Sequence, residues 1–116
     1  MSNSRAYSFP GTVLSTDMIV KICANEYGVD SAKIYTKCQK QDVAESRGMA
    51  MFFMRKLFRL SHAKVGYPFL TDHSNVCYWV KKIPELVKVD KVTRKRFISA
   101  GHNMCLSGET INELMK

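Results

Sequence analysis

Four hydrogen-bonding side chains follow one another in the middle of this chain: Asp72, His73, Ser74 and Asn75. Aspartate is a strong helix N-cap, because its carboxylate accepts hydrogen bonds from the free N–H groups of the first turn. Apolar residues then recur at the spacing of one buried helical face, at Val76, Trp79, Val80 and Ile83. The polar groups therefore lie at the N-terminus of a helix. Because carboxylate, imidazole and hydroxyl groups can pair with base edges, the sequence predicts a helix that reads the DNA major groove.

A second, shorter helix is predicted just before this one. Ser61 can cap a helix over about residues 62–69, and Gly66 within it indicates close packing against a neighbouring helix. The pattern breaks at residues 70–71, and the next helix covers residues 72–83, with Pro84 bending or ending it. A short helix, a tight turn and a longer helix form the plan of a helix-turn-helix.

The rest of the chain also shows helical patterns, so we predict an all-α, compact multi-helix domain with a helix-turn-helix. Ser15 or Thr16 can cap a first helix, which Gly28 ends. Three further helices and one polar loop are expected: helices over about residues 29–35, 42–60 and 88–105, and the loop at residues 36–41. The sequence contains no strand pattern.

Length and charge fit a single nucleic-acid-binding domain. A chain of 116 residues can bury one modest core. Its formal net charge of +8 favours a polyanionic partner, usually nucleic acid, and the alternative is a merely basic soluble protein. We divide the chain into three parts: a flexible arm at residues 1–14, a helical DNA-binding domain at residues 15–105 and a C-terminal tail at residues 106–116.

Other classes of protein find little support in the sequence. His62, His73 and His102 are scattered, and none forms a set spaced for catalysis or metal binding, so we expect neither an enzyme nor a metal or other cofactor. The four cysteines lack a CxxC pair and are expected to be reduced packing residues: Cys23, Cys38, Cys77 and Cys105. No apolar run can span a bilayer and the N-terminus lacks a signal-peptide layout, so we expect a cytoplasmic protein without membrane contact.

Five short motifs occur in order along the chain: YGVD at residues 27–30, RGMAMFFMRKL at 47–57, LSHAKVGYPF at 60–69, DHSNV at 72–76 and VKKI at 80–83. In order and spacing, residues 17–83 resemble the C-terminal DNA-binding domain of the bacterial replication initiator DnaA. The resemblance implies a helical domain of the Trp-repressor-like class. It also implies sequence-specific binding of double-stranded DNA, in the regulation of replication initiation or of transcription.

The resemblance assigns roles to individual residues. The base-reading positions of the family fall on three residues: Asp72, His73 and Ser74. Five residues are expected to contact phosphates: Arg47, Arg55, Asn75, Lys64 and Lys81. The arginines match basic positions of the family, the asparagine replaces a threonine, and the lysines lie on the predicted DNA side. The alternatives are capping alone for the aspartate, solvation for the histidine and the lysines, and surface ion pairs for the arginines.

The chain departs from the family pattern in two places. The family inserts an arginine from a basic loop into the minor groove, and Gln39 stands at that position here, between Lys37 and Lys40. Glutamine can bond to minor-groove acceptors, but it cannot exploit the negative potential of a narrow groove as arginine does. The turn of the family, G-G-R-D-H, is one residue shorter here and has no glycine. We expect both changes to alter the sequence preference more than the affinity.

A protein-interaction module on a helix-turn-helix scaffold is the main alternative function. In that case specific DNA readout has been lost, and the exchange at Gln39 points in this direction. The C-terminal tail, with Ile111 and Leu114 on one face, could then contact a protein partner or pack back on the domain. No GxxxxGK[ST] loop is present, so we expect no nucleotide binding and a free-standing DNA-binding domain.

Overall fold

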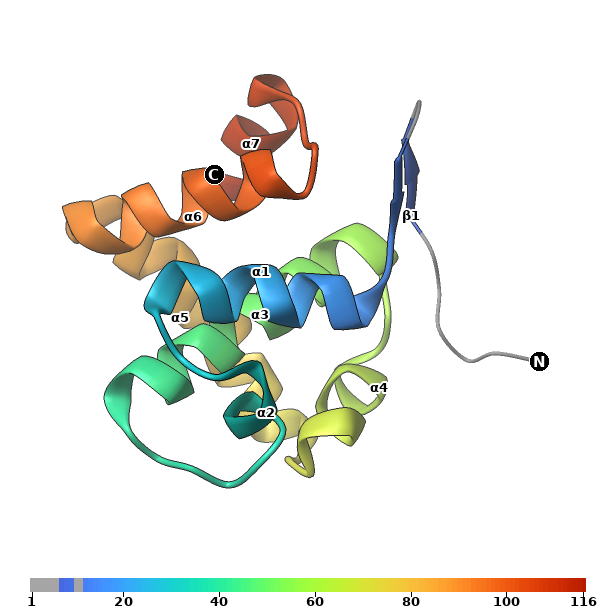
Figure 1. The fold of residues 1–116 in the computed structure, drawn as a ribbon, viewed down its shortest axis with the longest axis vertical. Coiled ribbons are helices and arrows are strands. Elements are labelled where there is room, and N and C mark those ends of the chain that lie inside the picture. The colour runs from blue at the N-terminus through green and yellow to red at the C-terminus, as the bar shows by residue number, and fades with distance from the viewer. Residues whose placement is uncertain (1–6, 10–11) are drawn as a thin grey trace.

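A computed structural model describes residues 7–9 and 12–116, with side chains described from Leu14 onwards. Its described part contains these helices: α1 (Thr16–Tyr27), α2 (Ser31–Ile34), α3 (Gln41–Phe58), α4 (His62–Gly66), the 3-10 helix η1 (Tyr67–Phe69), α5 (His73–Val89), α6 (Lys91–Asn103) and α7 (Gly108–Met115). Figure 1 shows α6 and α7 at one end of the molecule and α2 and α4 at the other. The predicted all-α class is confirmed.

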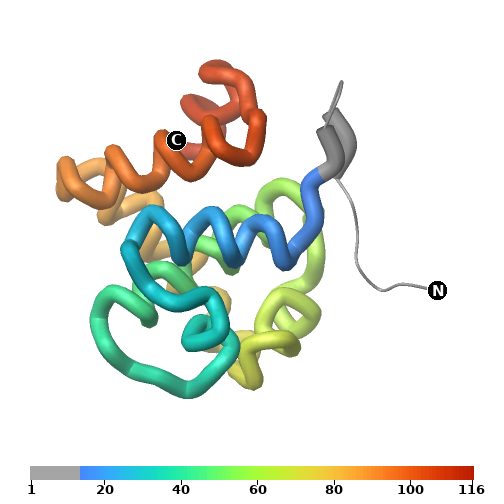
Figure 2. The backbone as a smooth tube through the Cα atoms, in the orientation of Figure 1, coloured from blue at the N-terminus to red at the C-terminus, as the bar shows by residue number. Residues whose placement is uncertain are grey.

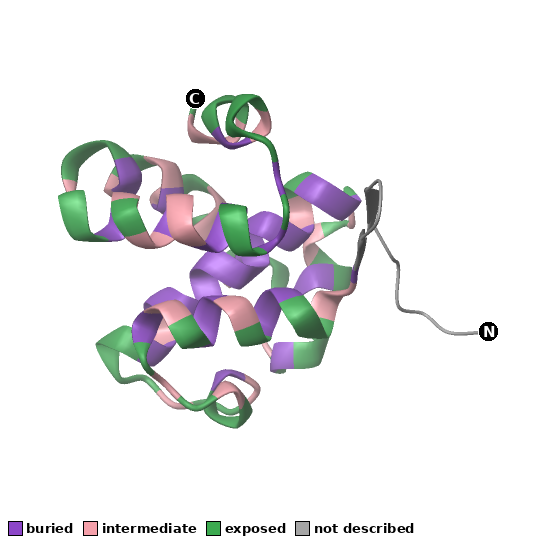
Figure 3. Ribbon diagram, turned by 45° about the horizontal axis from the view of Figure 1, so that its top comes forward, coloured by how far each residue is buried: buried purple, intermediate pink, exposed green. Residues whose placement is uncertain are grey.

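The core is built around α3, which is buried on nearly all sides (Figure 3). Ala50, Phe53 and Leu57 are among its buried residues. The neighbouring residue Phe52 is also buried, and its ring packs edge-on against Phe97 of α6 with ring centroids 5.6 Å apart. Phe53 stacks on Phe97 of α6 with ring centroids 4.7 Å apart, which joins α6 to this core.

Helix ends follow the signals that the sequence carries. The side chain of Ser15 accepts a hydrogen bond from the Met18 N–H at the start of α1. Gly28 ends this helix with φ of 65°, a left-handed conformation that glycine adopts without a steric penalty. Ser61 and Asp72 cap α4 and α5 in the same way as Ser15 caps α1. These local predictions are therefore confirmed.

The prediction for the region around Pro84 is wrong in its boundaries. Helix α5 does not end at Pro84 but continues to Val89, because Ile83 and Val87 lie one turn apart on the same buried face. Proline removes only one backbone donor, and this burial on both sides of it offsets the loss. The next helix begins at Lys91 rather than at residue 88, since Asp90 caps it by accepting from the Val92 N–H at 3.1 Å.

The C-terminal tail packs back on the domain. Ile111 of α7 is buried against Gly101 of α6, where an added Cβ would come within 2.8 Å of the isoleucine side chain. Leu106, in the connection between the two helices, is buried as well. The apolar face that the sequence left open to a protein partner is therefore covered by the domain itself.

A short hairpin precedes the helices. Strand β1 (Tyr7–Phe9) pairs antiparallel with β2 (Thr12–Leu14), with Tyr7 opposite Leu14. The expectation of no strand is wrong for this segment, which is too short for a clear alternation of apolar and polar residues. The start of the predicted flexible arm, residues 1–6, lies outside the described residues.

Candidate nucleic-acid interface

The helix-turn-helix consists of α4, η1, a three-residue turn at residues 70–72 and α5. Gly66 lets the two helices approach closely, because an added Cβ would lie 2.7 Å from the Thr71 carbonyl oxygen and 3.0 Å from a Val76 methyl group. The predicted close packing at Gly66 is confirmed. Leu70 makes the turn in a left-handed conformation with φ of 54°, although its side chain is mostly exposed. The turn is thus closed without the glycines of the family pattern.

The N-terminus of α5 presents the residues expected to read bases. Asp72 caps the helix through Oδ1, which accepts from the Asn75 N–H at 3.0 Å, and the Asn75 amide donates to the Thr71 hydroxyl at 2.9 Å. His73 and Ser74 are exposed on the first turn and make no hydrogen bond within the described residues. Their polar groups are therefore available to a ligand, whereas the Asp72 carboxylate already has a structural role.

Positive charge gathers beside this helix terminus. Desolvation, followed by repulsion from Arg55, His73, Lys56 and Lys81, holds the pKa of His62 below its ordinary value. These groups of α3 and α5 therefore lie within electrostatic reach of His62, the first residue of α4. Lys81 is exposed on α5, as Lys64 is on α4. The cluster gives this end of the molecule the charge that a phosphate backbone attracts.

Two arginines of α3 donate hydrogen bonds to backbone carbonyl groups of the protein. Arg47 is buried, and its Nε donates to the Ile34 carbonyl at 2.8 Å, while Nη2 donates to the carbonyls of Thr36 at 2.8 Å and Cys38 at 3.1 Å. Arg55 is half-buried and donates to the Leu60 carbonyl at 3.1 Å. These contacts give Arg47 a positioning role in the loop between α2 and α3. A phosphate contact by either arginine stays a prediction.

The loop between α2 and α3 lies at the same end of the molecule as the helix-turn-helix turn, as the chain path in Figure 2 shows. Its shape is fixed by Arg47 and by the Thr36 hydroxyl, which accepts from the Cys38 N–H at 3.2 Å. Lys37 and Gln39 are exposed on this loop and face α5. Lys40 is also exposed, but it lines a separate hollow beside α1 and α2.

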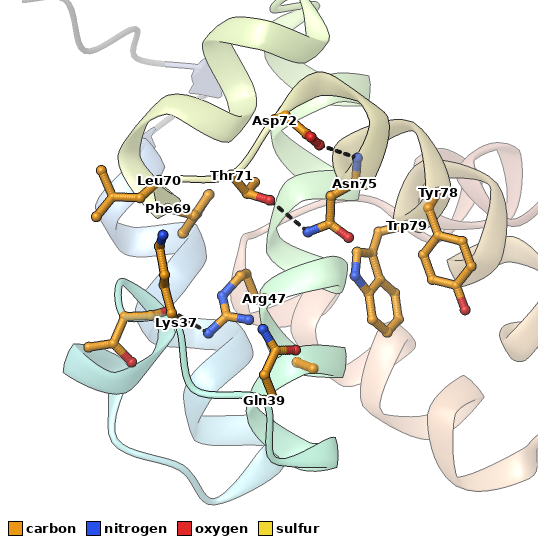
Figure 4. Close-up of a pocket in the computed structure, with 12 residues that line it drawn as sticks. Lys37, Gln39, Arg47, Phe69, Leu70, Thr71, Asp72, Asn75, Tyr78 and Trp79 are labelled. Atoms are coloured by element: carbon orange, nitrogen blue, oxygen red, sulfur yellow. Dashed lines mark hydrogen bonds between the residues drawn. The ribbon is translucent and has the colours of Figure 1, made fainter.

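A groove of about 680 Å³ separates the loop from α5 (Figure 4). Residues of the loop, of α3, of the turn and of α5 line it: Thr36, Lys37, Gln39, Ala44, Arg47, Phe69, Leu70, Thr71, Asp72, Asn75, Tyr78 and Trp79. The groove brings the predicted loop residues Lys37 and Gln39 opposite the N-terminus of α5. Thr71 and Trp79 also line the groove, which local sequence patterns did not predict, because they placed Thr71 in the turn and Trp79 on the buried face of the helix.

Three negative findings concern the described residues alone. No group of histidine, cysteine and acidic residues there could hold a metal ion. The four cysteines are free, and Cys23 is fully buried, as expected for a packing residue. Cys38 and Cys77 are half-buried, and Cys105 is exposed, so the predicted packing role is wrong for Cys105. No helix in this part of the chain has the length and apolar content needed to cross a membrane.

Comparisons with known proteins bear on the same segment. A family model described as the bacterial dnaA protein helix-turn-helix matches residues 16–83, from the start of α1 to the middle of α5. The chromosomal replication initiator protein DnaA of Synechococcus sp. (strain JA-2-3B'a(2-13)) is 34% identical over 74 residues, which cover 63% of this chain and 16% of the relative. DnaA 1 of Chlamydia muridarum (strain MoPn / Nigg) is 33% identical over 88 residues, or 76% of this chain and 19% of the relative. The chain thus spans less than a fifth of the length of either relative.

Proposed function

This chain belongs to the bacterial DnaA helix-turn-helix family, and from that premise we propose that it binds double-stranded DNA in a sequence-specific manner. One observation carries the proposal. The exposed polar turn of α5 and the exposed loop residues Lys37 and Gln39 stand on two sides of one groove, at an end of the molecule that also gathers cations. A helix and a loop spaced in this way suit the adjacent major and minor grooves of a duplex.

The proposed base readout is made by the first turn of α5. His73 and Ser74 project free donors and acceptors, which can pair with base edges in the major groove. One carboxylate oxygen of Asp72 accepts a hydrogen bond from the Asn75 N–H, and the other oxygen can accept from a cytosine amino group. Capping and readout by Asp72 are therefore compatible.

The proposed phosphate contacts surround this turn. Lys64 and Lys81 are exposed, and Arg55 is near enough to influence the pKa of His62 beside them. Asn75 lies in the first turn of α5, where its side-chain amide donates one N–H to the Thr71 hydroxyl and can donate its second to a phosphate. Arg47 contributes indirectly, because it holds the loop that would present Lys37, Gln39 and Lys40 to the minor groove.

The relatives named above are chromosomal replication initiators. We extend the proposal to a cytoplasmic role for this chain in regulating replication initiation or transcription by occupying specific DNA sites. The alternative, a protein-interaction module that has lost DNA readout, gains no support from the tail, since its apolar face is buried against α6.

Selection of bound duplexes from a random pool tests the proposal, with fluorescence anisotropy titrations of the selected and of scrambled duplexes at two salt concentrations. We expect an enriched motif, tighter binding to it than to scrambled DNA, and weaker binding to both duplexes at higher salt, because counterions are released from the phosphates. Absence of any duplex binding at low salt would refute DNA binding and favour the protein-interaction module. Equal, salt-dependent binding to all duplexes would refute sequence specificity.

A further inference from the structure

Trp79 has a placement that the roles assigned above do not use. Its indole ring lies flat against Gly48 of α3, where an added Cβ would come within 2.3 Å of the ring carbon Cδ2 and 2.4 Å of Cε3. Any larger residue at position 48 would therefore displace the ring. The glycine fixes the indole at the wall of the groove between the loop and α5.

The polar edge of this ring faces the groove. Figure 4 shows the indole nitrogen on the side turned toward Arg47 and Gln39. The indole N–H is a donor without acceptor capacity, and it makes no hydrogen bond to any residue that the structure describes. A half-buried donor aimed into a hollow is suited to an acceptor from outside the protein.

The rest of the groove is rich in donors. The amides of Gln39 and Asn75, the Lys37 ammonium and the Tyr78 hydroxyl also line it. Its one carboxylate, on Asp72, already accepts the Asn75 N–H. Chemistry of this kind fits an anion with several acceptor oxygens, such as a phosphodiester.

The positions of α5 and the loop relative to a DNA duplex indicate the source of that anion. A major groove and the adjacent minor groove of a duplex are separated by one sugar–phosphate strand. A protein with α5 in the major groove and the loop of Lys37 and Gln39 in the minor groove must straddle that strand. The groove lies between these two elements, so the strand would pass along it (Figure 4).

We propose that this groove is a binding site for the DNA strand between the two grooves, and that the Trp79 indole N–H donates to one of its phosphate oxygens. The inference rests on the proposed DNA binding and deepens it. Trp79 makes no base contact in this arrangement. It sets the register of α5 and the loop on the backbone, and it therefore strengthens binding to every sequence alike.

Fluorescence of the native chain provides the first test, because Trp79 is its single tryptophan. Addition of the selected duplex should change the emission of Trp79 and reduce its quenching by iodide, since the strand covers the ring. Anisotropy of a labelled duplex reports binding independently. Binding seen by anisotropy without any change in iodide quenching would overturn the inference and leave the proposed function intact. Absence of binding by anisotropy would overturn both.

A variant provides the second test. Trp79→Phe keeps an aromatic ring on Gly48 but removes the N–H, and loss of one hydrogen bond to a charged phosphate oxygen should weaken binding by about 10–100-fold. The loss should be the same on selected and scrambled duplexes, with an unchanged salt dependence, because no charge is removed. Asn103→Ala is the matched control, since it removes one neutral donor from α6 at the opposite end of the molecule and should leave affinity unchanged.

Methylphosphonate duplexes locate the contact. Replacing one phosphate at a time with a methylphosphonate removes its charge and an acceptor. At a single position between the two contacted grooves, this replacement should weaken binding of Trp79→Phe less than it weakens binding of the native chain. The inference would be overturned if the replacement weakened binding of both proteins by the same factor at every position. It would also be overturned if Trp79→Phe bound DNA as tightly as the native chain.

Discussion

Arg47 and Asp72 both direct hydrogen bonds to the backbone of the protein itself. Arg47 donates to four carbonyl groups of α2 and the following loop, and Asp72 caps α5. The neighbouring side chains of His73 and Ser74 remain exposed. At the residue scale, the interface thus combines side chains that hold its shape with side chains that are free to contact DNA.

Gln39 should limit the contribution of the loop to binding. In the variant Gln39→Arg, the guanidinium can enter a narrow, A·T-rich minor groove, where crowded phosphates focus negative potential. We expect tighter binding to duplexes with an A·T-rich flank than to duplexes with a G·C-rich flank, measured by titration against duplexes that differ only there. An equal gain on both flanks would mean that the arginine only adds charge. No gain in affinity on either flank would mean that the loop does not reach the minor groove of the DNA.

His62 should make the free protein less stable in mild acid. The pKa of His62 is lower in the folded protein than its ordinary value of 6.5, so the unfolded chain binds a proton more readily. Stability therefore falls as pH drops through about 6.5, and the variant His62→Gln should lose less stability over this range. Thermal unfolding at about pH 7.5 and pH 5.5 measures the difference. An identical loss of stability in both proteins would contradict this assignment.

At the element scale, the relation between α4 and α5 depends on Gly66. Local sequence was sufficient to predict these helices, because Ser61 and Asp72 carry their capping signals within three residues. It was not sufficient at Pro84, where burial of Ile83 and Val87 by distant parts of the chain keeps the helix intact. The same limit applies to Arg47, whose carbonyl partners are set by the path of the loop.

Gly66→Ala should disturb the helix-turn-helix. The added methyl group would overlap the Thr71 carbonyl oxygen, a backbone atom, and overpacking of this kind costs about 1–3 kcal/mol. We expect a lower free energy of unfolding in urea and weaker binding to the selected duplex. Gly108→Ala is the control, since a Cβ there meets nothing within 4 Å. Equal stability of the two variants would show that α4 and α5 do not require this close approach.

At the scale of the whole molecule, α6 and α7 extend a domain whose family match covers residues 16–83. Helix α6 is joined to it partly through Glu45 of α3, whose carboxylate accepts from the Tyr27 hydroxyl of α1 and, at 3.0 Å, from the Thr93 hydroxyl of α6. Sequence patterns predicted a helix at the place of α6, but they predicted neither the helix α7 in the tail nor this network, since the members of the network are far apart along the chain. The groove beside Trp79 was hidden for the same reason.

Ile111→Ala should test whether α7 belongs to the core. The isoleucine is buried against Gly101, so its truncation should lower the free energy of unfolding by about 2–5 kcal/mol. DNA affinity should be unchanged at temperatures where the variant is folded, because α7 lies at the end of the molecule away from α4 (Figure 1). The exposed neighbour Asn112→Ala is the control. Unchanged stability of Ile111→Ala would instead assign the tail to a partner.

The central claim, that the first turn of α5 reads bases, is tested most directly by the affinity of His73→Ala for the selected and for a scrambled duplex. His102→Ala is the matched control, because it removes another exposed histidine, on α6. We predict a loss of about 1–3 kcal/mol for His73→Ala on the selected duplex, little change on scrambled DNA, and no change for the control. An equal loss on both duplexes, or no loss on either, would contradict base reading by His73.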